Sequence, residues 1–453
     1  MNTTKPVREQ PQGSVLIVAL CLLFIMVGLV LTILDVASNH RTIAVRQMKL
    51  DQATYIAESG VEVAARFMES NLTAMVSSPT GATNGSGSVG GGNYYWYIFR
   101  TNASTYCIVS TGTVSGVISG SGTSTSVSRI VKLLDVYQPT YAEFALWCST
   151  NGVINFGGGD TFYGHVHTDT EIYFDGSSYF YAPLTSEYGT YSGSLSSVYL
   201  QDGLALNTYE GTMADVNFNG GTLNGSASLK TLATAGGTLD VVVSGNTTLT
   251  FNGGTVSITN PNQSWTNHSY SIPAAGGVIY VANVSTYTSG SKAGYVFLQG
   301  GTVTGPLTVV SENDMYIENN ITYTHNPVNN PTTTDALGLI SQDDIWVDTG
   351  APANLTIDAA MIAAGTSTLT SDTSSGSFGV IGYDSRTPTG TLTVYGGIVQ
   401  ENRGAVGTLD RHGNIGTGYT KNYSYDSRFL TKPPPDYPIV SGQINFSQWQ
   451  ESN

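Results

Sequence analysis

The stretch Ser14–Leu34, SVLIVALCLLFIMVGLVLTIL, decides the fold of the first part of this 453-residue chain. After Ser14, its only clearly polar residue is Thr32. A helix needs about 20 apolar residues to cross the hydrocarbon core of a bilayer. A cleavable secretory signal has a shorter apolar core, of about 7–15 residues, followed by a small-residue cleavage site. We therefore predict a membrane-spanning helix.

The helical pattern continues beyond this apolar run. Apolar residues recur at three- and four-residue spacing, which is typical of an amphipathic helix. They are Leu50, Ala53, Ala57, Val61, Ala64, Met68, Leu72 and Met75. No proline lies between Gly13 and Ser78. One stem helix is therefore predicted over residues 14–76, preceded by a leader at residues 1–13.

This segment resembles the N-terminal stem of type IV pilins, particularly of PilX-type minor pilins and of the K-type pseudopilins of type II secretion. The matching features are the polar leader ending in Gly13-Ser14, the apolar run, the polar stretch 39–52 and the sequence AESGVE at 57–62. The resemblance implies that a prepilin peptidase cuts between Gly13 and Ser14. It also implies that the stem associates with other pilin subunits.

Val18 departs from the pilin pattern. Most pilins have Glu at the fifth residue of the mature chain, where it is thought to neutralise the N-terminal amine of a neighbouring subunit. A carboxylate in an apolar bundle needs such a partner to offset its desolvation. With Val18 at this position, the resemblance implies a tip or minor component and not a repeating subunit. The alternative is an ordinary single-span anchor.

The position of the stem predicts a single-pass protein of the inner membrane whose C-terminal part lies outside the cytoplasm. In a pilus, this part would lie at the cell surface or at the pilus tip. Lys5 and Arg8 favour a cytoplasmic leader, although Arg41, Arg46 and Lys49 beyond the span weaken this charge bias. The formal net charge of −15 disfavours nucleic-acid binding.

Composition and motifs indicate a β-rich protein that is not an enzyme. Charged residues make up only 11% of the chain, which contains 53 glycines and 27 tyrosines. Such a mixture favours strands and turns over helices. The sequence contains no phosphate-binding loop, dinucleotide fingerprint, nucleophile elbow or cysteine-rich metal motif. We therefore predict no cofactor and no catalytic residue.

Beyond the stem, we predict a Gly/Ser linker at 77–93 and a small antiparallel meander at 94–140. Residues 77–93 have almost no bulky apolar group. The meander is indicated by three runs rich in β-branched and aromatic residues, 94–100, 106–113 and 124–137. In pilins such a meander packs against the upper half of the stem helix.

Residues 141–430 form a predicted parallel β-helix, or β-solenoid, which fits the short runs better than one immunoglobulin-like sandwich. Four similar turns motivate it: Asn219–Leu223, Ala235–Leu239, Asn252–Val256 and Gln299–Val303. The sequences DALGLI at 335–340, GGIVQENRGAVG at 396–407, YSYDSR at 423–428 and PPPDYP at 433–438 make residues 317–438 resemble an uncharacterised domain family found behind PilX-type stems. A Pro-rich tail is predicted at 431–453. The predicted fold class is thus mainly β with one long N-terminal α-helix.

His165, His167 and Asp169 are the best local candidate for a metal site. On a strand, alternate positions project from one face, so the three side chains are able to ligate a divalent ion. The alternative, which we favour, is a solvated polar strand face. Cys107 and Cys148 are the only cysteines outside the apolar run. They form either a disulfide, suited to an oxidising compartment, or two buried free thiols.

Carboxylates and aromatic residues provide further candidates. One hypothesis is that Asp343, Asp344 and Asp348 stack on acids one or two coils earlier. Such a cluster would bind Ca²⁺ or act on a glycosidic bond. The earlier acids are Glu312, Asp314 and Glu318. A plain polar surface is the alternative, and we favour it. Exposed aromatic residues are expected to bind sugar rings unless they pack in the β core; they are Tyr94, Tyr95, Trp96, Tyr173, Tyr179, Tyr181 and Trp346.

These features support two hypotheses. The first is a minor pilin or pilin-like component of a type IV pilus or type II secretion-like assembly, which displays a β-helical domain for adhesion or surface contact. The second is a membrane-anchored protein that binds or cleaves polysaccharide. The expected partners are the inner membrane, a prepilin peptidase, other pilin subunits and a glycan or surface ligand.

Overall fold

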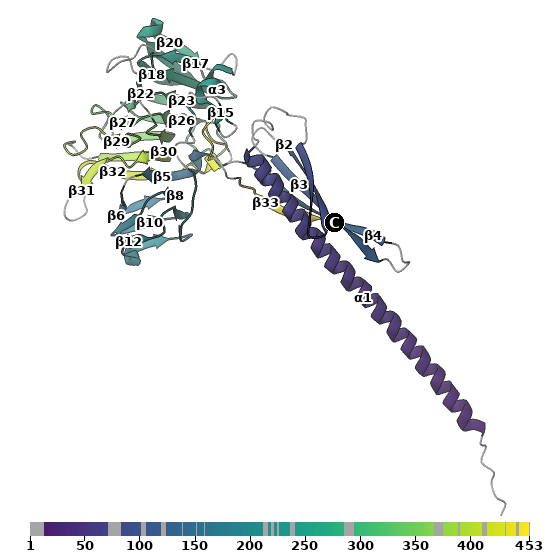
Figure 1. The fold of residues 1–453 in the computed structure, drawn as a ribbon. Helices are drawn as coiled ribbons and strands as arrows, with labels where there is room; N and C mark the ends of the chain where they lie inside the picture. Colours follow the sequence, from purple (N-terminus) through teal and green to yellow (C-terminus); the bar gives the residue numbers. More distant parts are fainter. Residues whose placement is uncertain are drawn as a thin grey trace, which may run out of the picture. The chain divides into compact units, whose positions relative to one another are not determined.

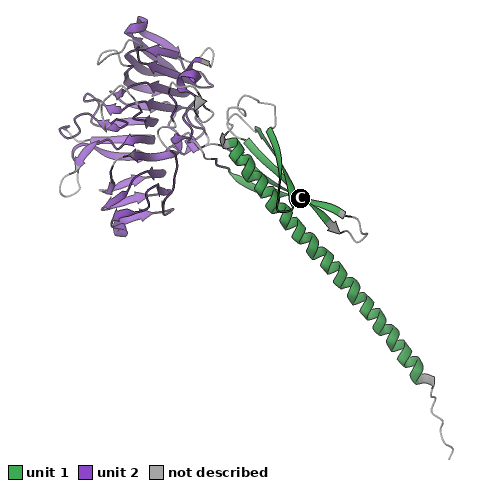
Figure 2. Ribbon diagram, in the orientation of Figure 1, with its two compact units in different colours: residues 1–68, 74–137, 446–453 green, residues 69–73, 138–445 purple. Residues whose placement is uncertain are grey.

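The computed structural model divides into two compact units (Figures 1 and 2). It describes residues 13–70, 83–100, 106–118, 124–137, 139–150, 152–157, 159–211, 216–218, 222–223, 226–235, 241–284, 294–366, 375–387, 390–409, 415–430, 432–440 and 444–452. Unit 1 comprises Met1–Met68, Ala74–Tyr137 and Phe446–Asn453. Unit 2 comprises Glu69–Thr73 and Gln138–Asn445.

Unit 1 is organised around one long helix, α1 (Gly13–Ser70), of 58 residues. At 1.5 Å per residue it is about 87 Å long. The large apolar side chains from Val15 to Val36 are exposed, whereas six residues of the later part are buried. These six are Ala53, Ile56, Ala57, Val61, Ala64 and Met68. The predicted stem helix is confirmed as far as Ser70, and residues 71–76 lie outside the described residues.

A five-stranded antiparallel sheet completes unit 1, in the order β1-β2-β3-β4-β33. The strands are β1 (Thr83–Val89), β2 (Gly92–Arg100), β3 (Tyr106–Ile118), β4 (Ser124–Val136) and β33 (Gln448–Ser452). The three predicted runs of the meander are β2, β3 and β4, which confirms them as strands. The last strand comes from the C-terminal end of the chain.

The linker predicted over 77–93 is wrong for residues 83–93. Thr83–Val89 is a strand, and Gly90 and Gly91 form the turn to β2 with positive φ angles of 58° and 79°. Gly85 and Gly87 pair with Trp96 and Tyr94 of β2. A side chain on either glycine would clash with those rings. Small residues therefore leave room for a neighbouring strand's aromatic side chains, and do not mark a flexible segment.

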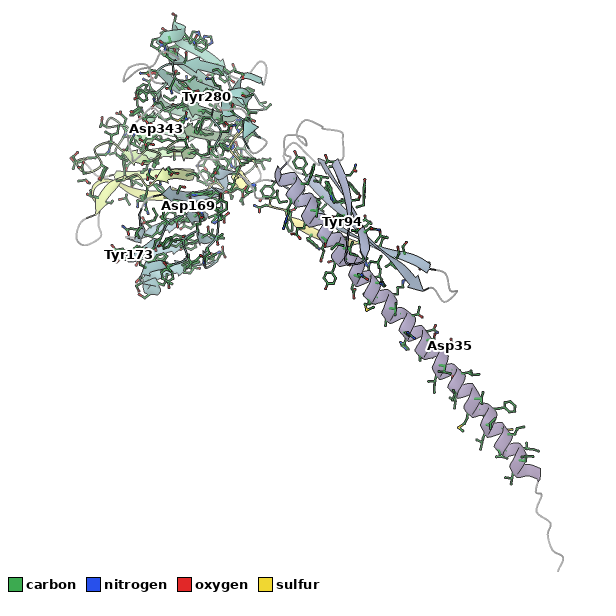
Figure 3. All side chains as sticks on the ribbon, in the orientation of Figure 1. Asp35, Tyr94, Asp169, Tyr173, Tyr280 and Asp343 are labelled. Atoms are coloured by element: carbon green, nitrogen blue, oxygen red, sulfur yellow. The ribbon has the colours of Figure 1, made fainter. Side chains whose placement is uncertain are left out.

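Two glycines allow α1 to lie close to the sheet. A Cβ atom on Gly60 would collide with Ser110 and contact Tyr94, and one on Gly112 of β3 would collide with the backbone of Ala53. Tyr94 lies beside α1 in Figure 3. The close contact buries the alanine-rich face of the upper stem, as expected for an amphipathic helix on a sheet.

Parallel strands stack in three ladders in unit 2 (Figure 1). Ladder A contains β17 (Val241–Ser244), β21 (Gly277–Ala282), β23 (Pro306–Ser311), β26 (Ala336–Ser341), β28 (Leu355–Ala363), β30 (Gly390–Asn402), β5 (Phe144–Thr150), β8 (His165–Thr168), β11 (Leu184–Ser186) and β14 (Leu204–Leu206). Neighbouring strands in this ladder are parallel, so each turn of the chain adds one rung.

The other two ladders are built from the remaining parallel strands. Ladder B contains β18 (Thr247–Gly253), β22 (Val296–Val303), β24 (Met315–Ile317), β27 (Ile345–Val347) and β29 (Phe378–Val380), and a separate set β6 (Ile154–Gly157), β9 (Ile172–Asp175) and β12 (Tyr191–Gly193). Ladder C contains the second half of β22, β25 (Ile321–Tyr323), the first halves of β28 and β30, β32 (Ile415–Ser424), β7 (Asp160–Phe162), β10 (Ser178–Phe180) and β13 (Val198–Leu200).

Shorter elements complete unit 2. β19 (Thr255–Asn260) and β20 (Trp265–Ser271) continue antiparallel from β18, and β31 (Gly407–Leu409) is antiparallel to β32. A hairpin of β15 (Thr222–Leu223) and β16 (Ser226–Ala227) precedes the short helix α3 (Leu229–Ala235). The 3-10 turns are η1 (Tyr141–Glu143), η2 (Leu195–Ser197), η4 (Pro261–Gln263) and η5 (Ser427–Leu430).

The ladders are assembled from two halves of the sequence that meet at one seam. β5 starts a first half that continues through β8 and β11 to β14, whereas β17 starts a second half that ends with β30 and β32. Ile398 of β30 pairs with Leu146 of β5, and Tyr423 of β32 pairs with Phe162 of β7. We call these two pairings, β30–β5 and β32–β7, the seam.

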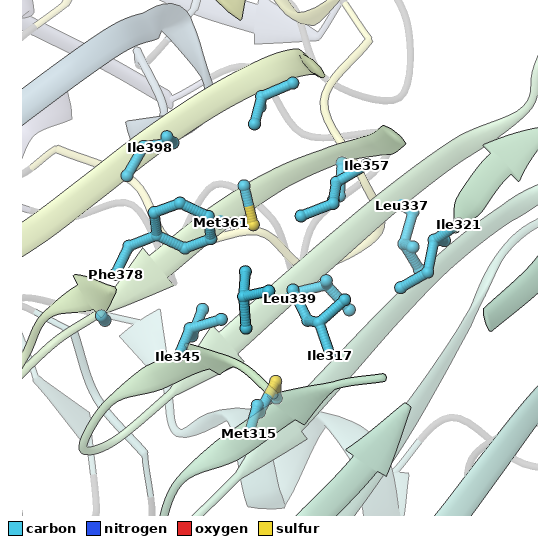
Figure 4. Close-up of a cluster of buried hydrophobic side chains, with 14 of the residues drawn as sticks. Met315, Ile317, Ile321, Leu337, Leu339, Ile345, Ile357, Met361, Phe378 and Ile398 are labelled. Atoms are coloured by element: carbon cyan, nitrogen blue, oxygen red, sulfur yellow. The ribbon is translucent and has the colours of Figure 1, made fainter. Parts of the chain in front are cut away.

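Two layers of apolar side chains hold unit 2 together. The inner layer lies between the ladders and includes Met315, Leu339, Met361 and Ile398 (Figure 4). The outer layer lies on ladder A and is formed by Trp147 and Tyr280 with residues of α3, η1, η5 and the segment 437–440. Strands buried on both faces read as continuous apolar runs, as in Gly277–Ala282.

The structure confirms the coarse fold class: one long N-terminal apolar helix, then a mostly β part with antiparallel and parallel sheets. Of the four similar turns, Asn219–Leu223 and Ala235–Leu239 lie partly outside the described residues, and the other two do not mark the rungs. Asn252–Val256 spans an antiparallel hairpin between β18 and β19, whereas Gln299–Val303 lies within β22. Leu307 pairs with Leu337 and Met315 pairs with Ile345, so these neighbouring rungs are thirty residues apart in the sequence. The Gly-Gly-Thr turns do not recur at this spacing.

The Pro-rich tail predicted over 431–453 differs from the structure. Tyr437 and Val440 are buried in the outer layer. The backbone N–H of Tyr141 donates to the Pro438 carbonyl at 3.0 Å, and that of Val440 donates to the Pro139 carbonyl at 2.9 Å. The chain then adds β33 to β4. Unit 2 is therefore an insertion between two neighbouring strands of unit 1.

Candidate functional site

The exposed part of α1 is the first candidate functional surface. Apart from Thr32 and Asp35, its side chains from Val15 to Val36 are apolar, with exposed fractions of 48% to 73% for the large ones. One helix, Val15–Met68, is long and apolar enough to cross a membrane. Val18, where most pilins have Glu, is 58% exposed on this surface. A surface of this kind is stable only in lipid or against other apolar helices.

The predicted processing site lies at the start of α1. Gly13 is the first residue of the helix, and residues 1–12 lie outside the described residues. Cleavage between Gly13 and Ser14 stays a prediction.

His165, His167 and Asp169 lie on or next to β8, and neighbouring side chains hold each of them. The Thr185 hydroxyl is 2.9 Å from His165 Nε2 and 2.7 Å from His167 Nδ1. His167 Nε2 is 2.8 Å from Asp169 Oδ1. Burial lowers the pKa of His165 to about 4, with a smaller contribution from His167.

The Asp169 carboxylate has protein partners at both oxygens. It accepts a hydrogen bond from Trp147 Nε1 at 3.1 Å and one from Ser149 Oγ at 2.6 Å. This network joins β8 to β5 and β11 and satisfies polar groups near the outer layer. The structure thus brings the three predicted residues together. Their contacts form a polar network between rungs, and because His167 is fully buried, the solvated strand face that we favoured is wrong there. Metal binding by the three residues stays a prediction.

Among the residues that the structure describes, Asp314, Asp343 and Asp344 are the group with ligand oxygens within 4.8 Å of one another. They occupy equivalent turns of two rungs: the Asn313 N–H donates to Ser311 Oγ, and the Asp343 N–H to Ser341 Oγ, each at 3.1 Å. The stacking of acids from successive coils is thus present for these three, and the plain polar surface that we favoured is wrong for Asp343 and Asp344, which are buried.

The stacked aspartates accept hydrogen bonds from the next rung. Asp314 Oδ1 accepts from the Asp344 N–H at 3.1 Å, and Asp344 Oδ1 accepts from the Ser377 N–H at 2.6 Å. The pKa of Asp344 is raised to about 7, mainly by burial and in smaller part by the carboxylates of Asp343 and Asp314, against the opposing backbone hydrogen bonds. These contacts give the cluster a role in joining rungs.

The other predicted acids lie apart from this cluster. Glu312 binds Tyr280 Oη at 2.8 Å and Lys230 Nζ at 3.2 Å, in the outer layer of ladder A. Glu318 and Asp348 follow β24 and β27 at their far ends, and Asp348 Oδ1 accepts from the Gly350 N–H at 2.8 Å. Glu318 and Asp348 thus follow equivalent positions of successive rungs, and the pKa of Glu318 is raised by burial first and by the Asp348 carboxylate second.

The cysteines are all free thiols in the structure. Cys107 is buried in unit 1 and Cys148 in unit 2, which is the second of the two alternatives for this pair. The Cys148 Sγ atom accepts a hydrogen bond from Gln400 Nε2 at 3.4 Å, across the seam.

An exposed tyrosine patch lies on the last rungs of ladder C. We define it as Tyr163, Tyr179, Tyr181 and Tyr199, which are 37% to 54% exposed. The rings of Tyr163 and Tyr181 stack with centroids 4.7 Å apart, and those of Tyr181 and Tyr199 are 5.3 Å apart. Tyr179 pairs with Tyr199 in register. The stacked rings cover each other's faces, so the patch presents ring edges and hydroxyl groups.

The region around the patch has an unusual composition. Tyr173, Tyr188, Tyr191 and Tyr209 are also exposed there. No Lys or Arg occurs between Leu133 and Leu229, whereas exposed acids such as Glu187 and Asp202 do. The sequence prediction included Tyr173, Tyr179 and Tyr181 but missed Tyr163 and Tyr199. Their signal is the spacing of Tyr163, Tyr181 and Tyr199, each eighteen positions after the last.

The remaining predicted aromatic residues are placed differently. Trp96 is buried and contacts Phe67 of α1, and Tyr94 packs against α1 near Gly60. Tyr95 is 47% exposed on the other face of β2. Trp346 pairs with Tyr316 in ladder B and packs against Gly379. Tyr94, Tyr95 and Trp96 thus belong to unit 1, whereas Trp346 and the tyrosine patch belong to unit 2.

Comparison with known proteins gives little further information. No protein-family model matches the chain, and no curated protein matches it. Among solved structures, the competence-associated pilin ComZ from Thermus thermophilus is similar at 9% identity, over 89% of this chain and 98% of that chain, with a TM-score of 0.31. A likeness at this TM-score carries no argument for fold or function.

Proposed function

We propose that this chain is a non-enzymatic minor pilin or pilin-like component of a type IV pilus or type II secretion-like assembly. In this proposal the inner membrane holds α1, and unit 2 is displayed outside the cytoplasm for adhesion or surface contact. We further infer that ladders A, B and C are the three faces of one parallel β-helix, because their inward side chains share a single apolar core.

The observation that supports the proposal best is the division of α1 into two parts. The part from Val15 to Leu34 is almost wholly apolar and exposed, and the part from Ala53 to Met68 packs on an antiparallel sheet. An ordinary anchor needs only the membrane span. A helix that continues from the span into the core of a β unit fixes that unit at a set distance from the bilayer, as a pilin stem would.

The first test is cleavage of the leader. The full chain is co-expressed with a prepilin peptidase, and the N-terminus of the product is sequenced. We expect Ser14 as the new N-terminus, and an intact leader in the Gly13→Val variant. An intact wild-type leader, with a known pilin cut under the same conditions, would contradict the pilin proposal and leave the ordinary anchor.

The second test uses Cys21, an exposed thiol in the apolar part of α1. In cells with the complete pilus or secretion assembly, a membrane-permeant bifunctional maleimide should join Cys21 to a stem cysteine introduced in another pilin subunit. The Cys21→Ser variant is the matched control. Absence of the cross-linked product at every position tried along the partner stem would count against stem association.

The tyrosine patch favours a second candidate function, polysaccharide binding by a membrane-anchored protein. Its hydroxyl groups repeat with the rungs, about 4.8 Å apart, and provide hydrogen-bond partners for an extended glycan chain. Cleavage has less support, because Asp314, Asp344 and Asp348 accept hydrogen bonds from backbone N–H groups.

Glycan binding is tested with the detergent-solubilised full chain on a glycan array. We expect binding that is lost in Tyr163→Ser/Tyr181→Ser and retained in Tyr383→Ser, which changes an exposed tyrosine elsewhere in unit 2. A reducing-end assay on any bound glycan tests cleavage. No binding to any glycan would remove the second candidate and leave display of another kind of surface.

A further inference from the structure

A small charged cavity lies at the seam of unit 2. Its volume is about 20 Å³, and its walls include Leu146, Phe162 and Ile398 of the inner core with the cationic side chains of Arg403 and Lys421. A cavity of this size holds about one water-sized particle. Because the two cations lie beside an apolar core, the question is which negative charges balance them.

Lys421 is an exposed residue, but its position in the strand register is one whose neighbours point inward in ladder C. In the register of β30 and β32 it pairs with Leu392, which is fully buried in the inner core. Lys421 lies between Tyr419, which is fully buried, and Tyr423, which lines the cavity. Its side chain is 31% exposed, so the site retains a path to solvent.

Two cations share one carboxylate at this site. Lys421 Nζ is 3.2 Å from Asp160 Oδ1, and Arg403 Nη2 is 3.8 Å from Asp160 Oδ2. Arg403 Nη1 also donates to the Asn155 carbonyl at 2.7 Å, which contributes no formal charge. The side chains of Arg403 and Asp160 are 22% and 13% exposed. The three groups together carry a formal charge of +1.

An excess positive charge next to an apolar core is unfavourable, because water cannot fully solvate it. Burial lowers the pKa of Lys421, and the nearby Arg403 lowers it further against the opposing effect of Asp160. A bound negative charge would remove this excess. The cavity beside Lys421 and Arg403 is the place where such a charge would fit.

We propose that this cavity binds one small monovalent anion, of which chloride is the natural example. The anion would lie against Lys421 and Arg403 of the second half of the sequence, which contact Asp160 of the first half. It would therefore stabilise the seam. Polyatomic anions such as sulfate and gluconate exceed the size of the cavity and would not replace chloride.

The test is the thermal stability of the full chain in detergent as sodium chloride replaces sodium gluconate at constant ionic strength. We expect the melting temperature to rise and to saturate. Lys421→Met removes one cation and should abolish the chloride effect. Lys432→Met, an exposed lysine of unit 2, should retain it. A rise that follows ionic strength equally with both anions, or one unchanged in Lys421→Met, would overturn the proposal.

A second variant keeps the test decisive if Lys421→Met does not fold. Asp160→Asn removes the carboxylate that competes for both cations, so half-saturation should occur at a roughly tenfold lower chloride concentration. Chlorine NMR provides a direct readout, since exchange with the site broadens the chloride line. We expect broadening in wild type and more at low chloride in Asp160→Asn. No broadening in either protein would overturn the proposal.

Discussion

Lys421 and Asp160 are separated by 261 positions in the sequence, yet the Lys421 Nζ atom lies 3.2 Å from Asp160 Oδ1. Each residue belongs to a different half of unit 2, and the two halves meet at the seam. Arg403 contacts the same carboxylate. This ion pair therefore forms only when the two halves of unit 2 pack against each other at the seam.

Removing the shared carboxylate should weaken unit 2. In Asp160→Asn the two cations lose their common partner, and we expect the free energy of unfolding to fall by about 1–3 kcal/mol, less than for a fully buried pair because the groups are partly exposed. Urea unfolding followed by tryptophan fluorescence measures it. Asp202→Asn, at an exposed position on a nearby rung, is the control and should change stability little. Equal losses in both variants would show that the seam contacts contribute nothing specific.

The close approach of α1 to its sheet should not tolerate a methyl group on the sheet side. Gly112→Ala places a Cβ against the backbone of Ala53, and neither main chain can move without shifting the helix. We expect a loss of about 1–3 kcal/mol in unit 1. Gly28→Ala is the control, because nothing lies within 4 Å of its Cβ position. Limited proteolysis of the α1–sheet region gives the comparison, and equal protection of both variants would contradict the tight contact.

Stability of unit 2 should fall as the pH rises from about 4 to about 7. Burial raises the pKa of Asp344 to about 7, against about 3.9 in an unfolded chain. Between these values the folded protein binds a proton that the unfolded chain has released, so the folded state loses stability with increasing pH. Glu143 and Asp358 have pKa values raised by burial to about 7 and about 6, and they act in the same direction.

Asp344→Asn isolates the contribution of this one carboxyl group. The amide oxygen keeps the ability to accept from the Ser377 N–H but does not ionise. We expect a smaller decline in melting temperature between pH 4 and 7 and a more stable protein than wild type at pH 8 (approximate limits of the window). Asp384→Asn, at an exposed position, should follow the wild-type curve. If Asp344→Asn did so too, Asp344 would be ionised normally.

Thiol reactivity should separate Cys21 from the other two cysteines. Burial raises the pKa of Cys107, and it raises that of Cys148 to about 11, so neither forms the reactive thiolate readily. We expect one thiol to react with a micelle-soluble maleimide in the folded protein and all three to react after unfolding without reductant, measured as mass increments. A single reactive thiol after unfolding would show a disulfide between Cys107 and Cys148.

Sequence patterns predicted the elements whose signal is local. The apolar run and its amphipathic continuation gave α1, and β-branched and aromatic runs gave β2, β3 and β4. β1 was missed because its glycines make room for Trp96 and Tyr94, which belong to another strand. The stacking of Asp314 on Asp344 was predictable because their turns have related sequences one rung apart.

The seam could not be predicted in this way. Leu146 and Ile398 pair across a distance in sequence that no repeat spans, and Lys421 lies in a polar stretch, TGYTKNYS, that gives no sign of its ion pair with Asp160. The Gly-Gly-Thr turns pointed instead to a period that the rungs do not follow. Register between distant strands depends on the whole core, and local patterns contain little information about it.

The insertion of unit 2 between β4 and β33 makes the two units separable in evolution. Both connections leave unit 1 at adjacent strands of one sheet edge, and Thr140 pairs with Ile439 where the inserted segment begins and ends. Rungs can therefore be gained, lost or exchanged within the insertion without altering α1 or the residues that pack on it. An insertion of this kind allows one stem to carry surfaces of very different chemistry.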